Sequence, residues 1–116
     1  MSNTCVEITC GDDEIATNFG SGCCASDALA TCVDQAPDGA TLHVGSGTFD
    51  WSSEVTVSDK HITIIGAGAS NTVLDRHQGG RFFFIRETGS VMLIGVTVQN
   101  GRVGVVAMLL RSVRVM

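Results

Sequence analysis

Residues 62–66 read Ile-Thr-Ile-Ile-Gly, and residues 91–95 read Val-Met-Leu-Ile-Gly. The two stretches share an apolar pattern that ends in glycine and recurs at an offset of 29 residues. Another short apolar run precedes each of them, residues 55–57 before the first and residues 82–84 before the second. A repeat of this length built from very short strands is typical of a solenoid, in which each turn of chain pairs with its neighbours.

The rest of the chain after Gly39 also consists of short apolar runs separated by turn residues. Its short apolar runs alternate with a period of two, which predicts strands, and Gly, Ser, Asn or Asp bounds nearly every run. The expected strands lie at residues 41–44, 55–57, 62–65, 72–74, 82–85, 91–94, 96–98 and 103–108. Strands this short are unusual in a β-sandwich. One alternative stays open, because Asn100-Gly101 is also a hairpin signal that would pair residues 96–99 antiparallel with 103–106.

The segment before these strands is rich in cysteine. All five cysteines (Cys5, Cys10, Cys23, Cys24 and Cys32) lie in the first 32 residues, and their spacing fits no common zinc site. Two disulfides with one cysteine left over are expected, which favours an oxidising compartment. No signal peptide is visible in residues 1–20, so a mature secreted chain and a reduced cytosolic chain both remain open, and we favour secretion. A short strand is expected at residues 5–10.

A helix is expected next. Ser26 is suited to the N-cap, and Asp27 to the positive end of the helix dipole. Leu29, Cys32, Val33 and Ala36 recur at helical spacing and predict one apolar face, and residues 37–39 (PDG) end the helix.

These residues resemble a known family. Residues 26–29 (SDAL), 37–44 (PDGATLHV) and 47–49 (GTF) are similar to the entry into a right-handed parallel β-helix of the pectin-lyase-like superfamily. Residues 62–68 (ITIIGAG) and 72–75 (TVLD) resemble its second coil, and residues 91–101 (VMLIGVTVQNG) the next one. The last pattern is also similar to repeats of polymorphic outer-membrane and algal cell-surface proteins. The resemblance covers residues 26–101 and leaves the tail from Val103 outside the pattern.

The expected fold is therefore all-β: a short right-handed parallel β-helix of about three coils with an N-terminal capping helix. Residues 1–25 form a Cys-rich segment, and residues 26–116 form the capping helix and the coils.

Charge is divided along the chain. Residues 1–59 hold ten acidic residues and no Lys or Arg, whereas residues 60–116 hold seven basic residues against Asp75 and Glu87. The net charge of −5 disfavours nonspecific nucleic-acid binding. The longest apolar run, residues 105–110, is too short to cross a membrane as a helix.

Motifs for catalysis are sparse. The Asp-rich motifs of polygalacturonase-like enzymes and the calcium-binding aspartates of pectate-lyase-like enzymes have no counterpart in the repeat region. The remaining candidate for a catalytic group is Asp75-Arg76-His77, with Arg81 and Arg86 nearby. We interpret these residues mainly as a polar turn. We expect no cofactor and no metal. Trp51 with Phe49 is expected to pack in the first coil, and His43 and His61 to be strand residues.

These observations predict a non-catalytic β-helix module of a secreted or cell-surface protein, structural, adhesive or carbohydrate-associated. The alternative is an N-terminal fragment of a polysaccharide lyase or hydrolase of the pectin-lyase-like class. Expected partners are a second copy, bound through the exposed C-terminal coil, and a polysaccharide. No nucleic acid or transmembrane segment is expected.

Overall fold

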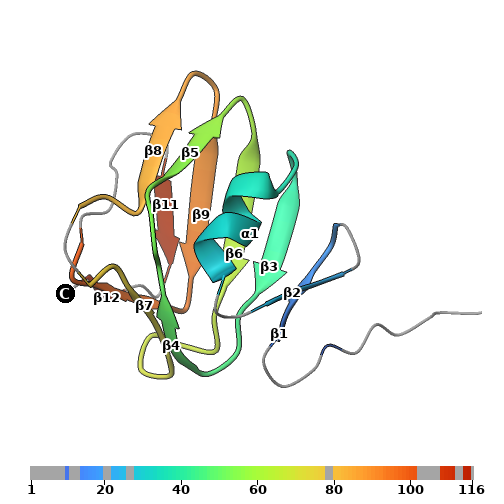
Figure 1. Cartoon of the computed structure of the whole chain (residues 1–116). Helices are drawn as coiled ribbons and strands as arrows, with labels where there is room; N and C mark the ends of the chain where they lie inside the picture. The colour runs from blue at the N-terminus through green and yellow to red at the C-terminus, as the bar shows by residue number, and fades with distance from the viewer. Residues whose placement is uncertain are drawn as a thin grey trace, which may run out of the picture.

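The computed structural model describes residues 10, 14–19, 22–25, 28–77, 80–101, 108–111 and 114–115. Within these residues the chain forms one short helix and three separate sheets (Figure 1). The largest sheet has six strands, which are β1 (Glu14–Thr17), β2 (Cys23–Ala25), β3 (Ala40–His43), β6 (His61–Ile65), β9 (Ser90–Ile94) and β11 (Met108–Arg111). Their spatial order is β11-β9-β6-β3-β1-β2.

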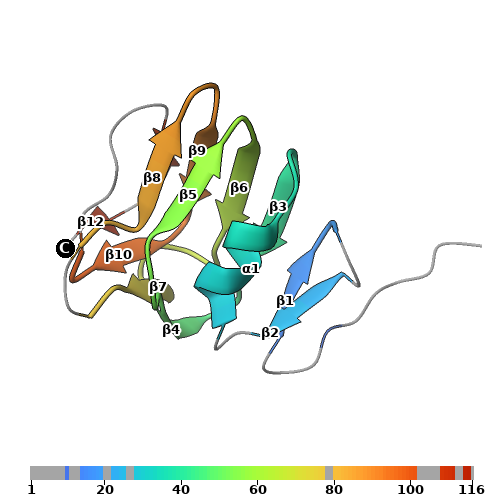
Figure 2. The same cartoon turned by 45° about the horizontal axis from the view of Figure 1, so that its top comes forward.

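The other two sheets are smaller. Four strands form the second sheet, namely β4 (Gly47–Asp50), β7 (Thr72–Asp75), β10 (Thr97–Gln99) and β12 (Arg114–Val115). The third sheet pairs β5 (Val55–Ser58) with β8 (Phe83–Arg86). Figure 2 shows β5 beside β8, and β4, β7 and β10 as successive neighbours. Every pair in these two sheets is parallel.

The repeat in the sequence sets the register of the strands. Ile62 lies opposite Val91 and Ile64 lies opposite Leu93, as the offset of 29 residues requires. The same offset brings polar side chains together between the turns: Ser58 Oγ donates to Glu87 at 2.7 Å, and Thr88 Oγ1 donates to Asp59 at 2.9 Å. The apolar repeat therefore predicts which strands pair, because a shift of one residue would turn the buried side chains outward.

The core lies between the three sheets. Its side chains alternate along the strands, so that Leu42, Ile64 and Leu93, on three neighbouring strands, are fully buried. Trp51 is also fully buried, and its indole nitrogen donates to the Phe82 carbonyl at 3.0 Å. Trp51 thus packs inside as expected, and Phe49 lies partly buried against the core.

Helix α1 (Leu29–Gln35) covers one end of the molecule and packs against β2, β4 and β5. The predicted apolar face is confirmed, since Leu29, Cys32, Val33 and Ala36 are all buried. The N-cap is Ala28, without a side-chain cap; Ser26 and Asp27 lie outside the described residues. At the other end Lys60 Nζ donates to the carbonyls of Asp34 and Ala36, both at 2.9 Å.

The predicted fold class is corrected by this arrangement. The sequence predicts a right-handed parallel β-helix, whereas the described strands form three separate sheets, and none of them closes or continues as a solenoid sheet. The six-stranded sheet is mixed, because β1 pairs antiparallel with both β2 and β3. The apolar repeat sets neighbour and register, but it carries no signal for this N-terminal hairpin. The molecule is a small, mostly β domain with one short helix.

Two further predictions, the hairpin after Asn100 and the strand at residues 5–10, fall mostly on residues outside the described ones. The alternative hairpin after Asn100 would use residues 103–106, which lie outside the described residues, and β10 instead pairs parallel with β7 and β12. The strand expected at residues 5–10 also lies outside them, except for Cys10, which is not in a strand.

Candidate functional site

The strongest cluster of polar side chains lies where β4, β7 and β10 end. Asp50, Asp75 and Gln99 are the last residues of these strands and lie side by side in the parallel register. Figure 2 shows the three strands as successive neighbours. His77 lies two residues after Asp75 and contacts both Asp50 and Asp75, and Asn100 directly follows Gln99 and contacts Asp75. We call these five residues the Asp75 junction.

Asp75 is the centre of the junction and is buried, with 8% of its surface exposed. Its Oδ1 accepts hydrogen bonds from the His77 backbone N–H at 2.8 Å and from Asn100 Nδ2 at 2.9 Å. Its Oδ2 accepts one from Gln99 Nε2 at 3.0 Å. These donors, Asn100 foremost, lower the pKa of Asp75 because they stabilise the charged carboxylate. Asp75 is therefore an ionised acceptor whose two oxygens are both engaged.

His77 links the junction to β4. Its Nε2 lies 2.6 Å from Asp50 Oδ1, and its Nδ1 lies 3.8 Å from Asp75 Oδ1. The hydrogen bond to Asp50 is the main cause that raises the pKa of His77, and the charge of Asp75 adds to it. The ring is half exposed, and the backbone has a positive φ of 61°. An imidazole between two carboxylates can carry a proton and a positive charge at this edge of the sheet.

Arg76 does not join the other two predicted residues. Its Nε donates to the Arg81 carbonyl at 3.0 Å, so the guanidinium is held to the turn before β8. Arg81 in turn forms an ion pair with Glu54 at 2.6 Å. The structure thus brings together Asp75 and His77 of the predicted group, and separates Arg76 from them.

Sequence reasoning missed Asp50, Gln99 and Asn100 as members of this cluster. Their position in the sequence was the signal that could have found them. Asp50 and Gln99 end the short strands β4 and β10, and Asn100 follows Gln99. The carboxyl ends of parallel neighbours meet at one edge of a sheet, so such positions converge.

The described residues contain no group of three His, Cys, Asp or Glu side chains able to hold a metal ion. At the Asp75 junction the reason is visible in the contacts. Asp75 accepts three hydrogen bonds from amide and backbone donors, two on Oδ1 and one on Oδ2, and these compete with a cation for its oxygens.

A second exposed feature lies on β8. Phe84 is 38% exposed, and among the described residues it is the one large hydrophobic side chain that is exposed to solvent. The guanidinium carbons of Arg81 and Arg86 lie 4.7 Å and 5.7 Å from its ring centroid. Phe82 and Phe83 are buried against Trp51. Phe82 precedes strand β8, so it escapes the alternation of the strand and is buried on the same side as Trp51, like Phe83.

The other histidines are strand residues, as expected. His43 and His61 are exposed on β3 and β6. His61 Nδ1 lies 2.5 Å from Ser90 Oγ, across the pair formed by β6 and β9. In the described part of the chain the ring of His61 has no carboxylate partner that would orient it as the base of a catalytic triad.

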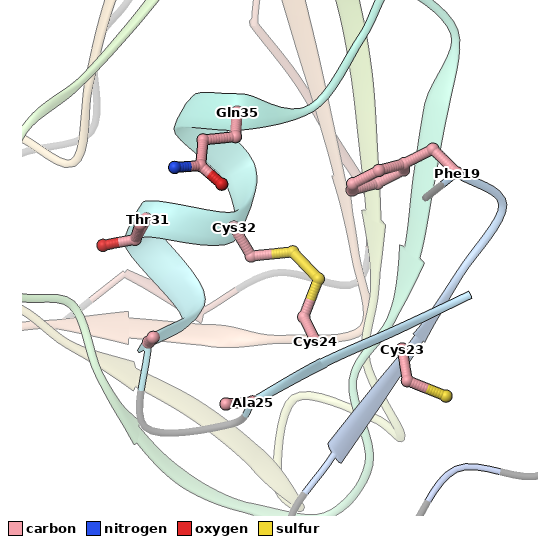
Figure 3. Close-up of a pocket in the computed structure, with 8 residues that line it drawn as sticks. Phe19, Cys23, Cys24, Ala25, Thr31, Cys32 and Gln35 are labelled. Atoms are coloured by element: carbon pink, nitrogen blue, oxygen red, sulfur yellow. A yellow bond between two sulfur atoms is a disulfide. The ribbon is translucent and has the colours of Figure 1, made fainter. Parts of the chain in front are cut away.

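A cavity of about 450 Å³ lies between the β1–β2 hairpin and α1 (Figure 3). The residues that line it are Phe19, Cys23, Cys24, Ala25, Ala28, Thr31, Cys32 and Gln35. None of them is acidic or basic, and none belongs to the Asp75 junction. Its wall includes the disulfide between Cys24 and Cys32, which ties β2 to α1, whereas Cys23 points to the other side of β2 (Figure 3).

Two disulfides, Cys10–Cys23 and Cys24–Cys32, stabilise this end of the molecule, as the sequence predicted. They are consistent with an extracellular protein. Among the described residues, no helix has the length and apolar character needed to cross a membrane.

Comparison of the chain with protein-family models, with curated proteins and with solved structures finds no match. The resemblance to the pectin-lyase-like superfamily is therefore wrong: no relative supports it, and the three separate sheets do not fit it. Short Gly-bounded apolar strands are a pattern that unrelated β proteins share, so the motifs were less specific than their number suggested.

Proposed function

We propose that this chain is a non-catalytic module of an extracellular protein, with a structural or adhesive role. The observation that carries the proposal is the bonding of Asp75. A general base needs an oxygen or nitrogen that can take a proton from a bound substrate. Both Asp75 oxygens already accept hydrogen bonds from the protein, and the lowered pKa of Asp75 opposes proton uptake.

The remaining polar groups of the junction favour the same role. Asp50, Asp75 and Gln99 come from three neighbouring strands, and His77 and Asn100 connect them by side-chain bonds. Such a network restrains the strand ends relative to one another. The network would thereby stabilise a domain with a structural or surface-presenting role.

An activity screen tests this proposal. Full-length protein is incubated with a panel of acidic and neutral polysaccharides, with and without calcium, beside the Asp75→Asn and His77→Ala variants. We expect no turnover by any of the three proteins. Turnover by the wild type that Asp75→Asn abolishes, while the variant stays folded by circular dichroism, would overturn the proposal.

We further propose secretion or display at a cell surface. Its support is the pair of disulfides, which persist in oxidising compartments.

The expected partner is a second copy, bound end to end. Of the described strands, β11 and β12 lie at one end of their sheets, while β1, β2 and α1 cover the opposite end. An uncovered strand edge offers unpaired backbone groups to another strand. The acidic first half and the basic second half of the sequence favour head-to-tail over tail-to-tail contact.

Light scattering tests the self-association. We expect oligomers whose mass rises with protein concentration. Their mass should also differ between low salt and roughly half-molar salt, because salt screens charge attraction beyond about 8 Å at physiological ionic strength and beyond a shorter distance at higher salt. A monodisperse monomer at both salt concentrations would contradict this proposal.

A second candidate role is binding of an acidic polysaccharide. It is favoured by Phe84, whose exposed ring has the guanidinium carbons of Arg81 and Arg86 at 4.7 Å and 5.7 Å from its centroid. Guanidinium groups pair well with carboxylates, and Glu54 already pairs with Arg81, which leaves Arg86 as the main contact. We expect retention on an immobilised polyuronate but not on a neutral glucan, and a loss of retention in Arg86→Gln and Phe84→Ala. Equal behaviour on both polymers would reject this role.

A further inference from the structure

Asn100 and Gly101 close the Asp75 junction at the end of β10. Asn100 is exposed and has a positive φ of 59°, and its Nδ2 donates to Asp75 Oδ1 at 2.9 Å. Asparagine is among the few residues other than glycine that adopt this left-handed conformation readily. The position therefore suits asparagine for two reasons, the backbone conformation and the amide donor.

Gly101 is required by space. A Cβ at this position would lie 2.6 Å from Arg76 Cβ and 2.8 Å from Phe82 Cε1. Phe82 is fully buried, so its ring has little room to move aside. Packing thus demands glycine directly after an exposed asparagine.

We propose that Asn100 is a site of spontaneous deamidation and that its conversion weakens the Asp75 junction. The backbone nitrogen of Gly101 loses its proton and attacks Cγ of Asn100. A new C–N bond forms, the bond from Cγ to Nδ2 breaks, and Nδ2 leaves as ammonia with the proton. Water then opens the five-membered succinimide, which leaves aspartate or isoaspartate at position 100. The step needs no oxidant, and a glycine without Cβ leaves the attacking nitrogen unobstructed.

The consequence follows from what faces position 100. Deamidation replaces a donor to Asp75 with a carboxylate, so two like charges meet where a hydrogen bond was. The other titratable groups of the junction are Asp50 and His77, and Arg76, which lies outside the junction, has its Cβ beside Gly101. Arg76 already donates to the Arg81 carbonyl and His77 Nε2 already bonds to Asp50, so a new carboxylate at position 100 would compete with these partners.

The rate of conversion is the first test. The folded protein is aged at mildly alkaline pH, and peptide mass spectrometry follows Asn100 together with Asn18 and Asn71, which precede Phe19 and Thr72. We expect Asn100 to convert several-fold faster than the two controls, since a side chain on the next residue hinders the attack. Conversion of Asn100 no faster than that of Asn71 would overturn the proposal.

The effect on the junction is the second test. Asn100→Asp mimics the product, and Asn100→Gly removes the amide without adding charge while keeping a tolerated backbone conformation. We expect Asn100→Asp to unfold at a lower temperature than Asn100→Gly at neutral pH, with the gap narrowing in acid as carboxylates are protonated. Equal unfolding temperatures for the two variants at neutral pH would overturn the proposal that deamidation weakens the junction.

Discussion

At the scale of single residues, alternation along β6 and β9 separates core from surface. Ile62, Ile64, Val91 and Leu93 are buried to within 1% exposure, whereas Thr63 and Met92 between them are only partly buried. The period of two in these runs predicts that alternate side chains share one face, and the structure confirms this alternation. The prediction succeeded because one face of each strand must be apolar over its whole length.

This alternation gives the first prediction. Ile64→Ala should lower the free energy of unfolding by about 2–5 kcal/mol, because it leaves a cavity among fully buried neighbours. The matched control Thr63→Ala, one residue away on the other face, should change it little. Denaturant unfolding followed by circular dichroism measures both, and equal losses would show that the register is wrong.

A second prediction concerns the protonation of His77. Its raised pKa comes first from Asp50, so the imidazolium should persist above its usual pKa of 6.5, and Asp50→Asn should return the value toward that level. The stability contributed by this pair should be complete below the unfolded pKa and disappear as the pH rises through the folded pKa. Titration of the imidazole proton signals by NMR measures the shift. A pKa unchanged by Asp50→Asn would refute the assignment.

At the scale of elements, the ends of α1 show where sequence signals failed. The apolar face of the helix was predictable from its spacing, but the observed helix is shorter than expected and begins after Ala28. Its C-terminal carbonyls are bound by Lys60, which lies between β5 and β6 and is 24 residues beyond Ala36. No local pattern announces a cap that arrives from so distant a part of the chain.

The disulfide-bonded end of the molecule gives the third prediction. Cys24–Cys32 joins β2 to α1, and Cys10–Cys23 closes the chain on the opposite side of β2. Each native disulfide should contribute roughly 2–4 kcal/mol to stability. Because the two bonds use four of the five cysteines, denatured protein without reductant should show one reactive thiol.

Two variants sharpen this prediction. Replacing both members of Cys24–Cys32 by serine should lower the unfolding temperature and leave the thiol count at one. Five thiols in the untreated wild type would contradict both the disulfides and the extracellular assignment.

At the scale of the whole molecule, the repeat predicted neighbours and register but not the complete architecture. Strands at the two repeats were found close to their predicted bounds, whereas β1, β2, β4 and β12 were missed. The strand expected at residues 103–108 lies outside the described residues except for Met108, where β11 begins. β4 contains Gly47 and exposed Thr48, and so lacks the apolar run that marks its neighbours. The β1–β2 hairpin is held by disulfides and by pairing with β3, which a local pattern does not reveal.

The candidate site shows the same division. Asp75 and His77 were identified because they lie close together in the sequence. The residues that they contact, Asp50, Gln99 and Asn100, are 24 to 27 positions away along the chain. Only the parallel register brings these side chains together. Arg76 was grouped with Asp75 by proximity in the sequence, whereas the end of β7 directs its side chain toward Arg81.

Our central claim is that the Asp75 junction holds the strand ends together, and the global stability of Asp75→Asn tests it most directly. The amide cannot accept all three hydrogen bonds, so we expect its free energy of unfolding at pH 7 to fall by about 1–3 kcal/mol. The matched control Asp34→Asn, on the exposed face of α1, should behave as the wild type.

The pH dependence of this difference follows from the lowered pKa of Asp75. The wild-type advantage should be complete above the usual value of 3.8 and disappear as the pH falls through the lower, folded pKa. Urea unfolding at neutral and acid pH therefore decides the claim. A clear loss at pH 7 that shrinks in acid is the predicted result, and identical unfolding of Asp75→Asn and the wild type at both pH values would contradict it.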